Sequence, residues 1–203
     1  MALWLGIAAA SSAAPALRGT VVDRNTGEPV PGALVKINYS GLIARPVEAQ
    51  YITWAELFVA TDGQGVFTAP ARIIPAVPPL SVFHGIGIQV IHPLYASGGG
   101  YGGLRIVPEE MDPKRCKSIV IGMARLEDFL AEGESKVERV MDCGEYFRQA
   151  AKLKLPIDAD KAFAYWLELA EKYPESKKAT EGRIREIKRG LEDAHPPEPK
   201  GQK

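Results

Sequence analysis

The spacing of apolar residues changes once along the chain, close to residue 124, and this change limits what the chain can fold into. Before it, short runs of Val, Ile, Thr and aromatic residues alternate with Gly, Pro, Asn and Asp; after it, apolar residues recur every three or four positions. Residues 1–124 contain 15 of the 20 glycines and 11 of the 16 prolines. The first pattern is typical of β-strands and the second of amphipathic helices. We therefore expect a mainly β protein, an all-β sandwich followed by a C-terminal α-helical appendage.

The first segment is predicted to contain short strands joined by tight turns. Gly27 is free to take a positive φ in the first turn, and Asp62 can accept backbone N–H groups in a hairpin over residues 61–67. A calcium loop there would need more carboxylates than Asp62 alone supplies. The expected strands are Leu17–Asp23, Gly32–Tyr39, Ala55–Thr61, Val66–Ala71, Gly87–Pro93, Gly103–Val107 and Ser118–Leu126.

The second segment is predicted to contain three helices with apolar faces. The first covers residues 137–151, the second follows the acidic positions Asp158 and Asp160, and the third begins at Ser176 and ends near Ala194. The expected inner residues are Phe163, Trp166, Leu167, Ala170 and Tyr173 on the second helix, and Ile184, Ile187 and Leu191 on the third. A single helix pair cannot bury its own apolar face. We expect it to pack on the sandwich or on the preceding helix, or to complete a partner. The Pro-rich tail, residues 195–203, is predicted to be disordered.

Residues 1–16 have the outline of a signal peptide, an apolar run followed by small residues. Ser12-Ala13-Ala14 and Ala14-Pro15-Ala16 both fit a signal-peptidase site. No basic residue precedes the apolar run, so a buried N-terminal segment or a start codon placed too far downstream are alternatives. We expect an exported protein, periplasmic or extracellular. No stretch approaches 18 apolar residues, so no transmembrane helix is expected.

Charge and cysteine content narrow the function classes. The 25 basic and 25 acidic residues give no net charge, which argues against nucleic-acid binding through bulk positive charge. The segments are separately near neutral, with 9 basic and 8 acidic residues in positions 1–124 and 16 basic and 17 acidic residues in positions 125–203. Cys116 and Cys143 could form a disulfide in an oxidising compartment, or remain two separate thiols.

The sequence contains no catalytic signature that we can identify, and we expect no cofactor and no metal site. His84 and His92 with Cys116 lack the spacing of a metal site, and His195-x-x-Glu198 lies in the expected disordered tail. The segment 97–103 lacks the Lys-Ser/Thr of a phosphate-binding loop. The protein is therefore predicted not to be an enzyme.

A set of motifs in the first segment resembles the carboxypeptidase regulatory-like (transthyretin-like) domain. They are Gly19-Thr-Val-Val-Asp23, Thr26-Gly27, Pro31-Gly32-Ala33, Thr61-Asp62, Gly65-x-Phe67 and residues 88–95. The resemblance covers residues 17–126 and implies a seven-stranded antiparallel β-sandwich, a non-catalytic module of exported proteins. The related hydroxyisourate hydrolases have early histidines and a Tyr-Arg-Gly-Ser ending, which are absent here. Two long connections, residues 42–51 and 72–85, depart from the family pattern and are the expected contact surfaces.

Residues 162–179 are similar to tetratricopeptide-type helix pairs, which implies a protein-interaction surface within the helical segment, residues 127–194. The resulting hypothesis is a non-catalytic exported module that binds or scaffolds a protein partner in the cell envelope. The alternative is a carbohydrate-binding module whose aromatic platform consists of Tyr39, Tyr51, Trp54 and Tyr101. Aromatic residues in a sandwich, however, more often belong to its core. The candidate interaction residues are Tyr51, Trp54, Tyr101, Trp166 and Tyr173.

Overall fold

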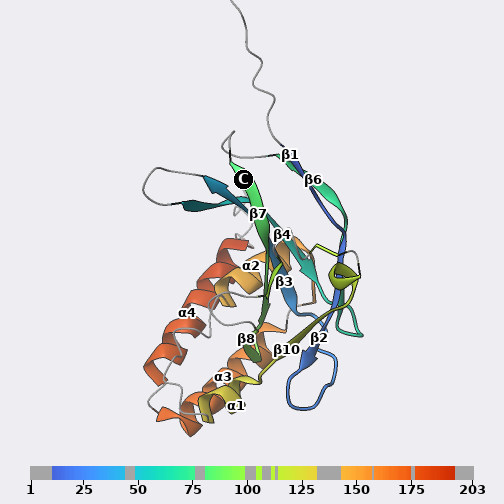
Figure 1. Ribbon diagram of the computed structural model, residues 1–203. Coiled ribbons are helices and arrows are strands. Elements are labelled where there is room, and N and C mark those ends of the chain that lie inside the picture. The colour runs from blue at the N-terminus through green and yellow to red at the C-terminus, as the bar shows by residue number, and fades with distance from the viewer. Residues whose placement is uncertain are drawn as a thin grey trace, which may run out of the picture.

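The computed structural model describes residues 11–43, 49–75, 81–98, 104–106, 111–112, 114–131, 143–156, 158–174 and 177–194. Strands make up the first part and helices the second (Figure 1). The strands are β1 (Ser11–Ala14), β2 (Leu17–Asp23), β3 (Leu34–Ile43), β4 (Gln50–Ala60), β5 (Val66–Ala69), β6 (Arg72–Pro75), β7 (Val82–His92), β8 (Tyr95–Gly98), β9 (Leu104–Ile106) and β10 (Ile119–Met123). The helices are α1 (Leu126–Ala131), α2 (Cys143–Lys152), α3 (Ala159–Lys172) and α4 (Lys177–Ala194).

The strands form three sheets that share one hydrophobic core. The sheets are β1-β6, β10-β2-β5 and β4-β3-β7-β8, with β9 also paired to β7. Inward side chains from all three contribute, including Ala14, Leu17, Ile37, Phe67 and Ile88, each no more than 2% exposed. The mainly β fold with a helical appendage is thus confirmed. The seven-stranded antiparallel arrangement is not: the described residues form ten strands, and β10 runs parallel to β2.

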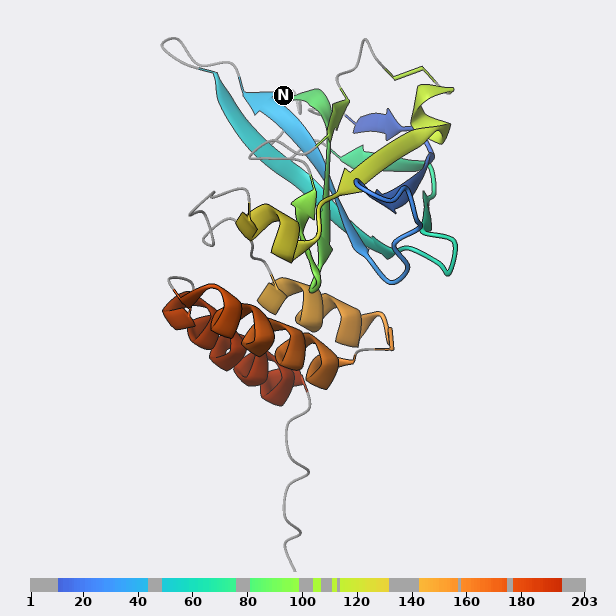
Figure 2. The same cartoon turned by 90° about the horizontal axis from the view of Figure 1, so that it is seen from below.

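The helices cover one end of the five-stranded sheet, on the face opposite the shared core. Leu34 of β3 and Ile91 of β7 point to this side and pack in a second core with α2, α3 and α4. Trp166, Phe147 and Ile187 are the most buried large side chains contributed by the helices. Figure 2 shows the helices as a separate layer against the sheet. We expected the helix pair to pack on the sandwich or on the preceding helix, or to complete a partner; in the structure it packs on both the sandwich and the preceding helix, because the second core includes both.

The two turns predicted from local chemistry are present. Gly27 has a φ of 74° in the turn after β2. Asp62 Oδ1 accepts the backbone N–H groups of Gln64 and Val66, both at 2.9 Å, between β4 and β5. Asp158 caps α3 by accepting the N–H of Lys161. All three features depend on contacts within four residues, which is why the sequence alone predicted the two turns and placed acidic residues at the start of α3.

Other elements differ from the sequence predictions. β1, β6, β8 and α1 were not expected, and Leu167 on α3 is 51% exposed rather than part of the inner face. β6 lies inside what the sequence presented as a long connection. Residues 1–10 of the expected signal peptide, the tail 195–203 and the first residues of the helix expected from 137 lie outside the described residues.

Candidate interaction surface

An exposed apolar row crosses the end of the five-stranded sheet that lies far from the helices. Leu42 of β3 pairs with Tyr51 of β4 on one side and with Val82 of β7 on the other. Directly paired residues point to the same face. Tyr51 is 62% exposed and Val82 is 61% exposed. We call Tyr51, Leu42 and Val82 the distal row.

The distal row is on the same face of β3 as the helices, at the opposite end of the strand. Alternate residues of β3 point to this face, from Leu34 beneath the helices through Lys36 and Ser40 to Leu42. The middle of the face is polar: Lys36 Nζ forms an ion pair with Glu56 at 2.9 Å, and Ser40 donates to the carbonyl of Gly85. The apolar residues at the far end are therefore separated from the second core by a polar stretch. Figure 2 shows the β3–β4 ribbon projecting away from the helices.

Packing on the core side connects the strands at this end of the sheet. Trp54 is an extra residue in β4, since Tyr39 pairs with Ala55 and Ser40 with Thr53. This bulge places the Trp54 indole over Gly41, where a Cβ would overlap the ring. Trp54 Nε1 donates to the buried Ser81 Oγ at 2.9 Å. The indole thus links β3 and β4 to the residue just before β7.

The two connections expected to form contact surfaces meet at the distal row. The first, residues 42–51, begins at Leu42 and ends at Tyr51; the second, residues 72–85, includes Val82. The ring of Tyr51 also contacts the His84 ring, with centroids 4.7 Å apart. Their adjacency could not be foreseen from the sequence, because it requires β3 to lie between β4 and β7.

The other candidate interaction residues are buried, half-buried or outside the described residues. Trp54 is 9% exposed and Trp166 is 2% exposed, and both indoles donate hydrogen bonds inside the protein. Tyr173 is half-buried and packs against the second core, with its hydroxyl 3.5 Å from the carbonyl of Glu127. Tyr101 lies outside the described residues. Tyr51 is therefore the one described candidate whose ring is largely exposed.

The β7–β8 turn is the point where the helices join the sheet. Trp166 Nε1 donates to the carbonyl of Pro93 in this turn at 2.9 Å, and the bond is buried. Tyr146 of α2 donates to the carbonyl of Gly32 at 3.0 Å, next to the start of β3. These two bonds, made to backbone carbonyls of the first segment, fix α3 and α2 relative to the sheet.

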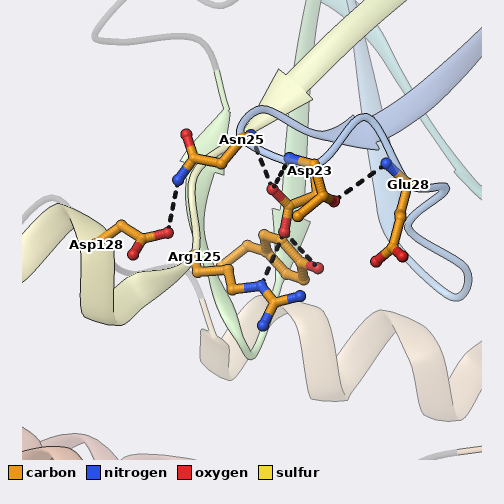
Figure 3. A network of polar contacts seen from close by, with 7 residues as sticks. Asp23, Asn25, Glu28, Arg125 and Asp128 are labelled. Atoms are coloured by element: carbon orange, nitrogen blue, oxygen red, sulfur yellow. Dashed lines mark hydrogen bonds and ion pairs between the residues drawn. The ribbon is translucent and has the colours of Figure 1, made fainter.

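A buried carboxylate network connects the two segments at the other side of the same junction (Figure 3). Asp23, at the end of β2, is 1% exposed and accepts four hydrogen bonds. Its donors are the N–H groups of Asn25 at 2.9 Å and Thr26 at 3.2 Å, Arg125 Nε at 2.8 Å and the Tyr95 hydroxyl at 3.3 Å. Asn25 also donates to Asp128 of α1 at 2.8 Å. Sequence reasoning missed this network because Arg125 is 102 residues away and carries no local signal.

The donors around Asp23 determine its protonation. Burial acts to raise the pKa of Asp23, but the hydrogen bond from Arg125 and those from the two backbone N–H groups outweigh it. The pKa of Asp23 is therefore below its usual value, and the carboxylate is charged at neutral pH. Burial also raises the pKa of Tyr95, and the Asp23 charge adds to that effect. The network is thus a set of fixed charges and hydrogen bonds that joins β2, β8 and the start of α1.

His92, the last residue of β7, lies in the same junction. Its Nδ1 accepts the N–H of Leu94 at 3.2 Å, and its ring contacts those of Tyr95 and Tyr146 with centroids 5.1 Å and 6.2 Å apart. Burial lowers the pKa of His92 to about 4. The imidazole is therefore neutral in the folded protein across the physiological range.

His92 is expected to make the protein less stable in mildly acidic solution. Between an unfolded pKa of 6.5 and a folded pKa of about 4, the unfolded chain binds one more proton than the folded chain. The free energy of unfolding should not depend on this group above pH 6.5, and should fall by at most about 3 kcal/mol as the pH decreases to 4. Urea titrations at several pH values measure this. His92→Asn, whose Oδ1 can still accept the Leu94 N–H, should remove the decrease; an equal decrease in both proteins contradicts the assignment.

The remaining sequence candidates are placed as follows. Cys116 is fully buried in the shared core, and the side chain of Cys143 lies outside the described part, so the disulfide stays a prediction. His84 and His92 are near opposite ends of β7. Within the described residues, no group of three or more His, Cys, Asp or Glu side chains is arranged to bind a metal ion. Among the helices that are described, none combines the length and apolar character needed to cross a membrane.

Comparisons with known proteins give little similarity. No protein-family model matches the chain, and no curated protein matches it. Among solved structures, the chain is similar to an alternative pilotin from the type II secretion system of Vibrio cholerae, at 13% sequence identity and a TM-score of 0.27. The match covers 57% of this chain and 98% of the pilotin chain. A TM-score of this size does not indicate a shared fold.

Proposed function

We propose that this protein is a non-catalytic module of the cell envelope that binds a protein partner through the distal row. The observation that carries the proposal is the exposure of Tyr51 and Val82 on both sides of Leu42, at the end of the sheet far from the helices. An apolar row at the end of a sheet face that the helices leave uncovered is a common feature of protein-binding sites. Aromatic residues such as Tyr51 are enriched in the central parts of such interfaces.

The support beneath the distal row favours binding of a preformed surface. Trp54 lies against Gly41 on the core side and is hydrogen-bonded to Ser81, so the three strands carrying the row are fixed before a partner arrives. A preorganised surface loses little conformational entropy on binding. The aromatic platform of the carbohydrate alternative would need an exposed Trp54, but this side chain lies in the shared core.

The family resemblances and the N-terminal sequence add domain assignments and export to the proposal. We infer that residues 17–126 are a carboxypeptidase regulatory-like sandwich, that residues 127–194 are a tetratricopeptide-like helical segment, and that the N-terminal segment directs export to the periplasm or the exterior. The motif residues 19–23 form β2, and the Thr61-Asp62 motif begins the turn before β5. The helix pair α3–α4 packs against the sheet, which leaves the distal row, not the helical face, as the proposed binding surface.

Site-specific crosslinking in the native host tests the proposed function. A photo-reactive amino acid is placed at Tyr51, at Val82 or at the control position Val120. Val120 is 69% exposed on β10, so it matches the exposure of the distal row on a different sheet. We expect a discrete protein adduct from positions 51 and 82. Adding Tyr51→Asp to the protein with the photo-reactive residue at position 82 should reduce the amount of that adduct at least tenfold. An equal adduct pattern at position 120, or no adduct from the distal row, refutes the proposal.

A further inference from the structure

The two cleavage sites predicted from the sequence lie at the end of a strand that belongs to the fold. β1 pairs antiparallel with β6 in a continuous register, from Ser11 opposite Pro75 to Ala14 opposite Arg72. Ala14 is 2% exposed and is part of the shared core. Hydrolysis after Ala14 or after Ala16 would remove this strand. Water would supply the hydroxyl of the new carboxyl terminus and a proton of the new amino terminus.

Removal of β1 would leave an open strand position beside β6. β6 pairs with no strand other than β1 in the described part of the chain. Its backbone N–H and C=O groups that face β1 would lose their partners, and the position of Ala14 against the core would be empty. β6 would then be a single strand with no described sheet partner, and its unpaired backbone groups could be paired again by an extended segment of another chain.

We propose that the β6 edge, filled in this structure by Ser11–Ala14, is the binding site of the processed protein for an extended segment of a partner protein. This inference rests on the export part of the proposed function, because a signal peptidase must remove residues 1–14 or 1–16. The bound segment takes the place of β1 and adds one strand antiparallel to β6. It is a second surface, separate from the distal row.

The side chains around the position define the segment that fits. Ser12 is opposite the buried Ile74, and Ala14 is opposite Arg72, whose guanidinium lies 5.8 Å from the centroid of the buried Tyr39 ring. Ala14 is 2% exposed, so the segment needs a small side chain at this inward position. Ala13 faces outward opposite Ile73, which remains 74% exposed because a methyl group covers little of it. A partner with a β-branched residue at this position would cover Ile73, a gain that β1 itself lacks.

The first measurement is the N-terminus of the exported protein. The full chain is produced in a bacterial host, and its intact mass is measured in the periplasmic and cytoplasmic fractions. The proposal requires a periplasmic protein that begins at Pro15 or Leu17. A periplasmic protein that retains Ser11–Ala14, or a chain that stays unprocessed, overturns it.

The second measurement is peptide binding by fluorescence anisotropy. The probe is a labelled peptide with the sequence of residues 10–16, added to the processed protein or to the unprocessed full chain. We expect binding to the processed protein and at least tenfold weaker binding to the full chain, whose own strand fills the position. A peptide with Asp in place of Ala14 should bind at least tenfold more weakly, and one with Val in place of Ala13 roughly two- to fivefold more tightly. Equal binding to both proteins, or no binding to the processed one, overturns the proposal.

Matched variants separate this inference from the proposed function and from loss of folding. Ile74→Glu in the processed protein should abolish peptide binding, and Ile73→Glu, on the outward side of the same strand, should leave the peptide bound. Tyr51→Asp should not affect the peptide, since it changes only the distal row. Tryptophan emission from the buried Trp54 and Trp166 reports whether each variant is folded. Loss of binding in a folded Ile73→Glu or Tyr51→Asp protein would contradict the assigned site.

Discussion

Replacing Asp23 with alanine is expected to lower the free energy of unfolding by about 3 kcal/mol. The substitution leaves the N–H groups of Asn25 and Thr26 without their acceptor and removes the partner of Arg125. Arg125 is about half exposed and can return to water, so its loss adds little; most of the effect comes from losing the hydrogen bonds to the charged carboxylate, which is itself 1% exposed. Urea denaturation at pH 7 measures the change.

Asp62→Ala is the matched control for Asp23→Ala. Asp62 also accepts two backbone N–H groups in a turn, but it is exposed and forms no described ion pair. Its loss should cost about 1 kcal/mol, because water can replace the carboxylate. If the two substitutions lower the free energy of unfolding equally, burial of the Asp23 network adds nothing to its stabilising effect.

The pH dependence of the Asp23 effect has a definite sign. The folded pKa of Asp23 is below its usual value, so its stabilising contribution is complete above the unfolded pKa, near 4. The contribution decreases as the pH falls below that value and through the folded pKa. The difference between wild type and Asp23→Ala should therefore be constant from pH 5 to 7 and shrink in stronger acid. His92 acts in a higher window, between pH 6.5 and 4, so the two groups can be measured separately.

The sequence predicted the parts of the fold that depend on neighbouring residues. The Gly27 turn, the Asp62 hairpin, the helix start at Asp158 and the inner positions Ile184 and Ile187 follow from contacts within one turn of chain. β1 was missed because Ser and Ala have low β-propensity and its pairing with β6 is the contact that makes it a strand. In general, strand pairing joins residues that are far apart in the sequence, so a strand that depends on its partner has no local signal.

The candidate surface was predictable only in part. The long connections were correctly identified as unusual, and Tyr51 as a candidate, but nothing local separates an exposed Tyr51 from a buried Trp54 three residues later. The separation comes from the bulge that places the indole over Gly41, and that bulge requires β3 as the partner strand. Trp166 was placed on the apolar face of its helix, but its hydrogen bond to Pro93 joins residues 73 positions apart.

Replacing Trp166 with alanine is expected to have the largest effect of the substitutions considered, a loss of about 4 kcal/mol in the free energy of unfolding. The indole is 2% exposed, lies in the centre of the second core and donates to the carbonyl of Pro93. Trp166→Phe keeps most of the volume and removes only the donor, so it should cost about 2 kcal/mol by leaving a buried carbonyl unpaired. Leu167→Ala, at a neighbouring 51% exposed position of α3, should change stability by no more than about 0.5 kcal/mol.

The location of the Trp166 effect matters as much as its size. Trp166 belongs to the second core, whereas β2, β5 and β10 pack in the shared core on the other side of the five-stranded sheet. Hydrogen exchange of Trp166→Ala should therefore show faster exchange in α2, α3 and α4 than in those three strands. An equal loss of protection in both cores would contradict this, since it would mean that the helices and the sheets unfold only together. Selective loss would show that the sheets, and with them the distal row, keep their structure without a firmly docked helical layer.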